Sequence, residues 1–315
     1  MFAVGTVNAD FLMRVDAPPQ EGASLIAHRL LRSSGGRAGN RAVMARRLGA
    51  PTRLFGCIGD DDLAEQAVEG PSVAGVDLEA LRRVPRSTGV VTILVGEAGT
   101  KTMIMAPGAN DAFTRRDGER LGEALRGAPI GTVLALDTEL APAAVEPAVE
   151  TAHESGRITV LDPTRPCRVN DRLLEHSDHL TPNAEEAGRL TGFAVRCVSD
   201  AHRAARQLRE RGPRHVHVRL PRGGCVTAWA DGEARIHPPG NLDVLDTTGA
   251  GDAFVGTLAV ALAEGRSTVD AARLAVAAAA CAASGFGPQQ SYPDRQLLDA
   301  TARAVRVEIL PLRDA

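Results

Sequence analysis

The chain has 315 residues, of which 44% are hydrophobic and 24% charged, values typical of a folded α/β protein of one large domain or two ordinary ones. A formal net charge of −3 provides no basic field for nucleic acid or an anionic membrane. No apolar run reaches the ~20 residues needed to cross a bilayer, so we expect neither nucleic acid nor a membrane as a partner.

The cysteines and the N-terminus favour a cytoplasmic protein. The first ten residues, MFAVGTVNAD, contain neither the basic nor the apolar region of an export signal. The cysteines lie far apart and form no CxxC pair, so we expect reduced, mostly buried thiols: Cys57, Cys167, Cys197, Cys225 and Cys281. Lys101 is the only lysine, which excludes the phosphate-binding pattern GxxxxGK[ST].

Short apolar runs alternate with stretches of helical period, which predicts βαβ units and a mostly parallel sheet. In chain order the expected core strands are Phe2–Thr6, Thr52–Cys57, Val133–Leu136, Ile158–Leu161, His215–Leu220 and Cys225–Trp229. The expected helices are Asn40–Leu48, Ala143–Glu154, Ala184–Leu190, Asp200–Arg211, Ala250–Ala263 and Val269–Ala283.

Two regions interrupt this alternation and predict a second, smaller sheet. Phe11–Asp16 with Leu25–Arg32, and Gly89–Val95 with Lys101–Ala106, have the pattern of antiparallel pairs with too few apolar residues for burial on both faces. We interpret them as a lid of about residues 11–33 and 88–107 that projects from a single domain of residues 1–315. No internal repeat or linker divides the chain.

The segment DTTGAGDAF, residues 246–254, carries the strongest functional signal. Gly249, Ala250 and Gly251 at a helix start leave successive backbone N–H groups open, and these form an anion cradle with the positive end of the helix. Asp252, in the first turn, is placed to accept a proton from a substrate hydroxyl during phosphoryl transfer. The same helix terminus is expected to favour its ionised form and make it a weak base. The alternative is a tight turn with a capping aspartate.

Three further segments predict ligand contacts that are less specific. Gly36, Arg37 and Asn40 belong to the glycine-rich run GGRAGNRA before a helix, which is also compatible with an ordinary strand-to-helix turn. Asn8 and Asp10 follow the first strand, where α/β sheets place ligands and where Asx turns also occur.

The last of these segments is PNAEE, residues 182–186. Asn183 and Glu186 share one face of a helix start and could hold a hydrated Mg²⁺ beside nucleotide phosphates. They also match a capping box, in which each residue satisfies a backbone N–H of the other.

These segments, in this order, resemble the ribokinase-like (PfkB) carbohydrate kinase family, with a pattern closest to its ribokinases. GGRAGN resembles the N-terminal signature and DTTGAGDAF the C-terminal one. Similar strings lie between them at residues 55–61, 75–77 and 107–110. The resemblance covers residues 4–293 and implies a three-layer α/β/α sandwich with a mostly parallel central sheet and a β-sheet lid.

The resemblance also implies roles for individual residues. It implies that Asp252 is the base, that Gly249–Gly251 form the anion hole, and that Asn183 and Glu186 organise Mg²⁺ and phosphate. The implied sugar contacts are Asn8, Asp10, Gly36, Arg37, Asn40 and Asp137, the last at a position where the family usually has glutamate. A monovalent cation, K⁺ by similarity, would be held by Asp246, Thr248, Ala282, Gly285, Gly287 and Ser291.

The family pattern further implies ATP as phosphoryl donor, a small sugar as acceptor and a homodimer formed through the lid. Two positions depart from it: Arg222 is shifted by one position in the loop near the nucleotide, and Ala64 stands where glycine is usual. A nucleoside kinase with a similar site and a sugar-binding protein that has lost catalysis remain alternatives. A dinucleotide-binding dehydrogenase is disfavoured because Gly5 is not followed by GxGxxG. Ribose, a 2-deoxy sugar, fructose and 2-keto-3-deoxygluconate all remain open as substrates.

Overall fold

The computed structural model describes residues 1–17, 19–22, 24–96, 101–240 and 243–310. Residues 97–100 of the predicted lid and residues 311–315 of the predicted domain lie outside this part of the chain.

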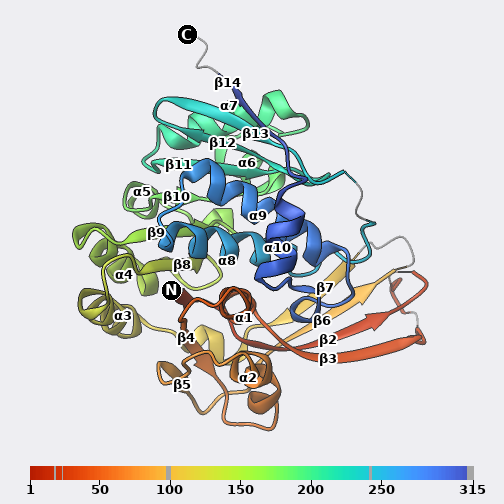
Figure 1. Cartoon of the computed structure of the whole chain (residues 1–315). Coiled ribbons are helices and arrows are strands. Elements are labelled where there is room, and N and C mark those ends of the chain that lie inside the picture. Colours follow the sequence, from red (N-terminus) through yellow and green to blue (C-terminus); the bar gives the residue numbers. More distant parts are fainter. Residues whose placement is uncertain (18, 23, 97–100, 241–242, 311–315) are drawn as a thin grey trace.

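A ten-stranded sheet runs through the molecule in the order β14-β13-β12-β11-β10-β9-β8-β1-β4-β5 (Figure 1). Its strands are β1 (Phe2–Val4), β4 (Arg53–Ile58), β5 (Leu81–Arg83), β8 (Val133–Asp137), β9 (Ile158–Asp162), β10 (His179–Leu180), β11 (His215–Arg219), β12 (Cys225–Trp229), β13 (Gly232–Ile236) and β14 (Val307–Leu310). Strands β5 to β11 in this order pair in parallel, and β12, β13 and β14 add antiparallel pairs at one edge.

Helices cover both faces of this sheet. They are α1 (Arg37–Arg47), α2 (Leu63–Val73), α3 (Arg115–Gly127), α4 (Pro142–Glu154), α5 (Asp171–Glu175), α6 (Ala184–Thr191), α7 (Val198–Arg209), α8 (Ala250–Ala263), α9 (Thr268–Ala283) and α10 (Arg295–Ala302). Three short 3₁₀ turns are η1 (Gly108–Ala112), η2 (Pro166–Arg168) and η3 (Gln289–Ser291).

The alternation of side chains along the strands divides the core into two layers. In β8, Leu134 and Leu136 pack in a cluster with α3 to α7, whereas Val133 and Ala135 pack with α1, α8, α9 and α10. Because both faces are buried, the strands are continuous apolar runs in the sequence. The predicted three-layer α/β/α architecture with a mostly parallel sheet is confirmed.

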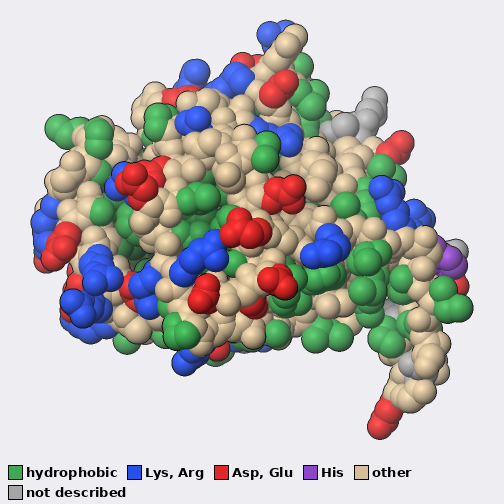
Figure 2. Space-filling view, turned by 90° about the horizontal axis from the view of Figure 1, so that it is seen from below, with side chains coloured by type: hydrophobic (Ala, Val, Ile, Leu, Met, Phe, Trp, Pro, Cys, Tyr) green, Lys and Arg blue, Asp and Glu red, His purple; other side chains and the backbone are tan. Residues whose placement is uncertain are grey.

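A separate four-stranded sheet has the order β3-β2-β6-β7 and lies beside the helices α1 and α2 (Figure 1). Its strands are β2 (Asn8–Arg14), β3 (Arg29–Gly35), β6 (Gly89–Val95) and β7 (Lys101–Ala106). One face buries a small apolar cluster, whereas every residue of β7 is exposed. Seen from below, hydrophobic side chains gather on the part of the surface that this sheet occupies (Figure 2).

Both predicted antiparallel pairs exist, but the first lies about three residues from its predicted place. Consequently Asn8 and Asp10 belong to β2 of the smaller sheet, whereas β1 ends at Val4. Sequence periodicity missed α2, α3, α5 and α10. Helix α3 is rich in charged residues, α5 has only 5 residues, and α2 and α10 are interrupted by polar side chains. The cysteine prediction is partly wrong: Cys57 and Cys225 are buried, but Cys167 and Cys197 are exposed, all of them free thiols.

Candidate active site

The predicted helix start at Ala250 is confirmed, and its backbone conformation depends on glycine. Gly249 adopts a left-handed conformation with φ 78°, and a Cβ there would collide with Pro288. At Gly251 a Cβ would come within 2.5 Å of Arg219 Nη1. Helix α8 therefore begins with unobstructed backbone N–H groups, and Asp252 is in its first turn.

Asp252 is buried, with different surroundings for its two oxygens. Asn40 Nδ2 donates to Oδ2 at 2.9 Å, whereas Oδ1 has no hydrogen-bond partner in the described part of the chain. Arg41 Nε lies 3.4 Å from Oδ1, and Arg37 Nη1 lies 4.0 Å from it. The carboxylate is thus held at Oδ2 by an amide, while its buried Oδ1 lies beside two arginines without accepting a hydrogen bond from a described residue.

The pKa of Asp252 is raised, against the expectation from its place at a helix N-terminus. Burial is the largest cause, and the charges of Arg41 and Arg37 and the hydrogen bond from Asn40 oppose it. A raised pKa makes the carboxylate a stronger proton acceptor than the sequence predicted.

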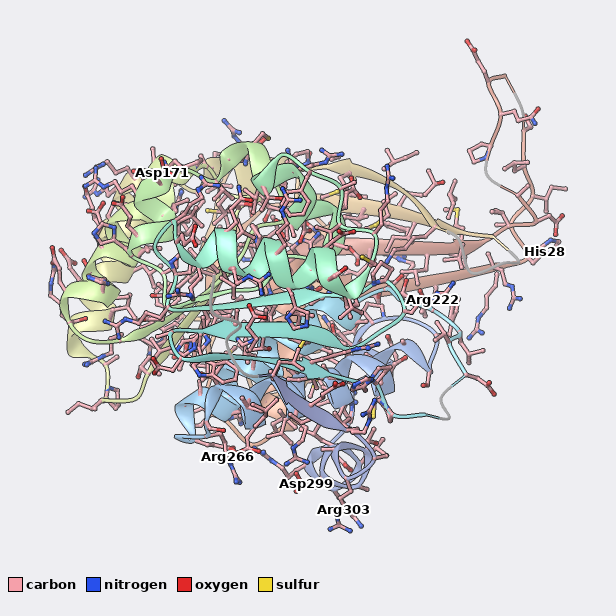
Figure 3. The ribbon with its side chains drawn as sticks, turned by 90° about the horizontal axis from the view of Figure 1, so that it is seen from above. His28, Asp171, Arg222, Arg266, Asp299 and Arg303 are labelled. Atoms are coloured by element: carbon pink, nitrogen blue, oxygen red, sulfur yellow. The ribbon has the colours of Figure 1, made fainter. Side chains whose placement is uncertain are left out.

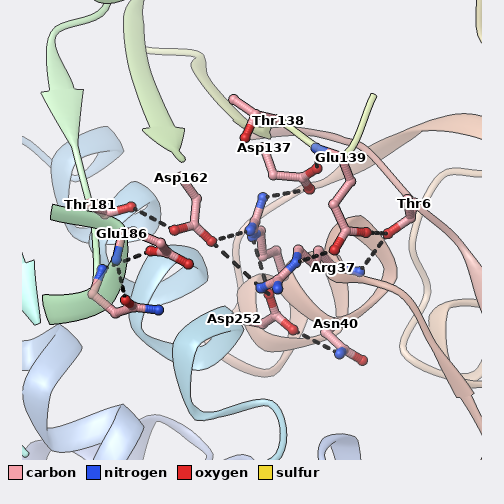
Figure 4. Close-up of polar contacts among 12 residues, drawn as sticks. Thr6, Arg37, Asn40, Asp137, Thr138, Glu139, Asp162, Thr181, Glu186 and Asp252 are labelled. Atoms are coloured by element: carbon pink, nitrogen blue, oxygen red, sulfur yellow. Dashed lines mark hydrogen bonds and ion pairs between the residues drawn. The ribbon is translucent and has the colours of Figure 1, made fainter. Parts of the chain in front are cut away.

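Two arginines of α1 connect the carboxylates at the ends of the parallel strands (Figure 4). Arg41 is fully buried and donates to Asp137 Oδ2 at 3.1 Å and to Asp162 Oδ2 at 2.6 Å. Arg37 Nε donates to Glu139 Oε1 at 2.8 Å. Each arginine therefore ties α1 to the strand ends that face α8.

The structure corrects the expected role of Asp137. Its side chain is 0% exposed; Oδ2 binds Arg41, and Oδ1 accepts a hydrogen bond from the Glu139 N–H at 2.8 Å. The buried guanidinium of Arg41 needs a paired charge, and Asp137 provides it. Glu139 lines a small cavity with residues of the β1–β2 loop, β2, β6, β7, η1 and the loop after β9: Thr6, Asn8, Val91, Met105, Asn110 and Arg165. Asp111 contributes a second carboxyl group to this cavity.

Asn8 and Asp10 lie on the same buried face of β2, as expected of residues two apart in a strand. Asn110 Nδ2 donates to Asn8 Oδ1 at 2.8 Å, which orients the Asn8 amide. Asp10 is 4% exposed, and its Oδ1 has no hydrogen-bond partner among the described residues. Burial and the charges of Asp252 and Glu139 raise the pKa of Asp10 to about 8. A Cβ at Gly35, opposite Asn8 in β3, would collide with the Asp10 carboxylate.

Gly36 connects β3 to α1 with φ 82°, and a Cβ there would collide with the backbone of Thr6. This close approach places Arg37 and Asn40 beside the first turn of α8, so that Asn40 reaches Asp252. The predicted contact residues of the glycine-rich run and of DTTGAGDAF, far apart in sequence, are therefore neighbours.

Asn183 and Glu186 form the capping box that the sequence offered as the alternative. Asn183 Oδ1 accepts from the Glu186 N–H at 2.8 Å, and Glu186 Oε2 accepts from the Asn183 N–H at 2.7 Å. Arg219 Nη2 binds Glu186 Oε2 at 3.3 Å and Asp162 Oδ1 at 2.8 Å. Burial and the charge of Asp162 raise the pKa of Glu186 to about 6. The cap fixes Glu186 at one side of the site and is compatible with a second role.

The loop residues expected around a monovalent cation meet behind α8. Asp246 Oδ1 accepts from the Thr248 N–H at 2.9 Å, and Asp246 Oδ2 accepts from the Gly287 N–H at 3.2 Å. Ser291 Oγ donates to the Gly287 carbonyl at 2.7 Å, and Gly285 has no room for a Cβ beside Ser291. Ala282 is buried in the last turn of α9. One carboxylate among backbone carbonyls and hydroxyls is a hard-oxygen donor set that suits an alkali cation.

Arg222 is exposed in the β11–β12 loop, at the end of the central sheet from which the smaller sheet extends (Figure 3). Within the described ranges no cluster of three or more His, Cys, Asp or Glu side chains is arranged to hold a metal ion. None of the described helices is both long and apolar enough to cross a membrane.

Comparison with known proteins identifies the family of the chain. A model of the pfkB family of carbohydrate kinases matches residues 1–295. The chain belongs to this family. Ribokinase of Haemophilus influenzae is 32% identical over 294 residues, 93% of this chain and 95% of that protein. Deoxyribokinase of Salmonella typhi is 29% identical over 293 residues, 92% of this chain and 94% of that protein.

Arabidopsis thaliana ribokinase complexed with ribose and ATP has the same fold, with a TM-score of 0.86 at 27% identity, covering 96% of this chain and 98% of that one. The predicted ribokinase-like fold is thus confirmed. This carbohydrate kinase is an ATP-dependent phosphotransferase with an alcohol group as acceptor.

Sequence reasoning missed four charged residues around Asp252: Arg41, Glu139, Asp162 and Arg219. Three of them could have been found from their position at strand ends: Asp162 and Arg219 are the last residues of β9 and β11, and Glu139 follows β8. Ligands of α/β proteins bind at the carboxyl ends of parallel strands, so charged residues there were candidates even without a motif.

Proposed function

We propose that this kinase transfers the γ-phosphoryl group of ATP to a hydroxyl of a free sugar, with Asp252 as base and the N–H groups of Gly249–Gly251 as anion hole. The observation that carries the proposal is the state of Asp252, which is buried at the start of α8 with a raised pKa and with an Oδ1 that accepts no hydrogen bond from a described residue. A sugar hydroxyl hydrogen-bonded to Oδ1 would be oriented towards phosphorus and lose its proton there.

The sugar would lie between β2 and α1. Asp10, with an unpartnered buried oxygen, accepts from two adjacent hydroxyls in this proposal, and Asn8, Asn40 and the backbone at Gly36 surround them. Arg37 holds Glu139, which takes the place first assigned to Asp137. We propose an aldopentose, ribose or 2-deoxyribose, because the relatives named above are a ribokinase and a deoxyribokinase.

Mg²⁺ and K⁺ complete the proposed chemistry. Glu186, fixed by its capping box with Asn183, would hold the hydrated Mg²⁺ that accompanies ATP. A K⁺ ion held by the oxygens around Asp246 and Thr248, with the carbonyl or hydroxyl groups of Ala282, Gly285, Gly287 and Ser291, would brace the loop before the anion hole.

The smaller sheet, from about residues 11–33 and 88–107 of a single domain 1–315, would act as a lid that excludes water from the phosphoryl group. The lid exposes several apolar side chains, which favours a homodimer formed through it: Leu30, Met103, Ile104 and Met105. The molar mass from light scattering tests for this homodimer. The use of ATP and the free thiols of the described cysteines favour a location of the protein in the cytoplasm. Fractionation of cells tests this location.

ADP release with a panel of pentoses, hexoses, sugar acids and nucleosides tests this proposal. We expect the pentoses to give the highest kcat/KM and Asp252→Asn to lower kcat by about 10²–10⁴-fold, the usual contribution of a positioned base. A nucleoside as best substrate would favour the nucleoside kinase alternative. If the Asn variant retains more than about a tenth of the wild-type kcat, Asp252 is not the base.

A further inference from the structure

A chain of buried hydrogen bonds leads from helix α2 to Asp252. The Gly70 N–H donates to Ser34 Oγ at 3.1 Å, and Ser34 Oγ donates to Gln289 Oε1 at 2.7 Å. Gln289 Nε2 donates to Asn40 Oδ1 at 2.9 Å, and Asn40 Nδ2 donates to Asp252 Oδ2 at 2.9 Å. The chain thus joins residues of α2, β3, η3, α1 and α8 that are far apart in sequence.

The directions of these bonds agree with the groups at both ends of the chain. The Gly70 N–H can only donate, so Ser34 Oγ accepts from it and its own hydrogen is free to point to Gln289 Oε1. At the other end an ionised Asp252 carboxylate can only accept, so Asn40 presents its NH₂ group to Asp252 and its oxygen to the Gln289 NH₂ group. Gln289 then faces Ser34 with its oxygen.

The packing leaves this arrangement no alternative partners. Ser34, Gln289 and Asn40 are all buried, so water does not compete for their polar atoms. A Cβ at Gly70 would collide with both Gln289 Oε1 and Ser34 Oγ, which means that α2 approaches the chain closely because this position is glycine. Unlike Asn40, Gln289 makes no hydrogen bond to a carboxylate among the described residues. It lies between Gly287 and Ser291 of the loop expected around the cation, where the sequence assigned it no role.

We propose that Gln289 is a positioning residue that locks the Asn40 amide, so that Asp252 Oδ2 always receives a hydrogen bond and Oδ1 alone is left to accept the proton of the substrate hydroxyl. The inference rests on the proposed role of Asp252 as base. If Asn40 turned its amide around, its oxygen would face Oδ2, and the two acceptors would repel. The carboxylate would then lose its fixed orientation.

Several other charged groups influence the ionisation of Asp252 and therefore the dependence of kcat on pH. Arg37 and Arg41 of α1 favour its ionised form, and Asp162 at the end of β9 disfavours it. Asp10 of β2, Lys101 of β7 and the buried Tyr292 after η3 also interact with its charge. None of these groups changes in a variant at Gln289. A shift of the pH profile in the uncharged Gln289→Met variant therefore isolates the hydrogen-bond chain, whereas in Gln289→Glu the added charge contributes to the shift in the same direction.

The test compares Gln289→Glu with Gln290→Glu. A glutamate at 289 has the same shape but no donor, so Asn40 must turn its NH₂ group towards it and its oxygen towards Asp252. We expect kcat to fall about 10–150-fold, the range for a lost hydrogen bond to a charged group. We also expect the acidic limb of the kcat–pH profile to move to higher pH, with KM for ATP within about twofold of wild type. Gln290 is the exposed neighbour in η3, so Gln290→Glu adds the same charge outside the chain and should behave as wild type.

Gln289→Met removes the donor without adding charge and covers the case that the Glu variant does not fold. It frees Asn40 to take either orientation, so we expect a smaller fall of kcat and a shift of the acidic limb in the same direction. A purely structural role for Gln289 would lower Tm and leave the limb in place. The inference is overturned if Gln289→Glu matches Gln290→Glu, or if the Met variant retains the wild-type kcat and limb.

Asp252→Asn separates this outcome from failure of the proposed function. If Asp252→Asn is inactive while both Gln289 variants retain the wild-type profile, only the role of Gln289 is wrong. If Asp252→Asn is fully active, the role of Asp252 as base and the inference both fail.

Discussion

If Asp10 binds the sugar as proposed, the affinity for sugar should depend on pH, because the Asp10 carboxyl group is buried and its Oδ1 has no hydrogen-bond donor among the described residues. The pKa of about 8 means that the free enzyme carries a proton on Asp10 at neutral pH. Sugar hydroxyls donate hydrogen bonds and therefore prefer the ionised carboxylate, so binding must displace this proton.

The size of the effect follows from the pKa. With a value of about 8, roughly one molecule in ten is ionised at pH 7 and roughly one in a hundred at pH 6. The Kd for sugar should therefore fall about tenfold from pH 6 to pH 7 and level off above about pH 8. Asp10→Asn keeps the shape but cannot ionise, so we expect weaker binding at pH 8.5, by about 10–150-fold, and no dependence on pH.

Calorimetry of sugar binding between pH 6 and 8.5 measures this directly, and KM for ATP provides the internal comparison. The matched control is Asp171→Asn, which changes an exposed aspartate at the opposite end of the molecule from Arg222 (Figure 3) and should leave both profiles unchanged. A wild-type Kd for sugar that is constant over this range would refute the reasoning, as would an Asn variant that retains the pH dependence.

Two further predictions concern the ion and the core. Activity in K⁺ should exceed activity in tetramethylammonium at equal ionic strength, because an ion beside Asp246 would brace the loop before Gly249; equal rates would remove the ion from the mechanism. Burial lowers the pKa of His217 from 6.5 to about 3, so the unfolded chain binds a proton there at a higher pH than the folded protein does. The contribution of His217 to the free energy of unfolding therefore decreases as the pH falls from 6.5 towards 3. Buried carboxyl groups with raised pKa values change the stability in the opposite direction, so the wild type must be compared with His217→Gln at each pH. Between about pH 6 and pH 3, the free energy of unfolding measured in urea should fall by about 1.4 kcal/mol more per pH unit in the wild type than in His217→Gln. An equal fall in both proteins would contradict this.

The parallel core of the fold could be predicted from the sequence because its strands are buried on both faces. Apolar runs such as Val133–Leu136 and Ile158–Leu161 lie within one or two residues of β8 and β9. The smaller sheet was predicted with a shifted first hairpin, since a half-buried strand such as β2 contains polar residues at buried positions. Asn8 and Asp10 were expected after the end of the first strand, whereas they lie in β2.

The ionisation of the site could not be predicted, because it depends on burial that no local pattern encodes. The place of Asp252 in the first turn of α8 suggested a low pKa, whereas loss of solvent outweighs the helix terminus. Likewise, the end of a parallel strand is a reasonable place for a sugar contact, which is the role that the family resemblance implied for Asp137. Its pairing with Arg41 depends on a guanidinium from a helix ninety-six positions away in sequence.

The arginines explain how a buried site can contain this many carboxylates and still present an ionisable base. Arg41 is fully buried, and loss of its charge would leave Asp137 unpaired and take from Asp162 one of its arginine partners, which is far more costly than the loss of an exposed ion pair. Arg219 continues the ion pairs from Asp162 to Glu186, at the proposed phosphate end. Arg41 can therefore approach Asp252 Oδ1 at 3.4 Å without donating a hydrogen bond to it, because its other nitrogens are held by two stronger partners. The positive charge opposes the rise in the pKa of Asp252, while Oδ1 keeps its lone pairs for a substrate hydroxyl.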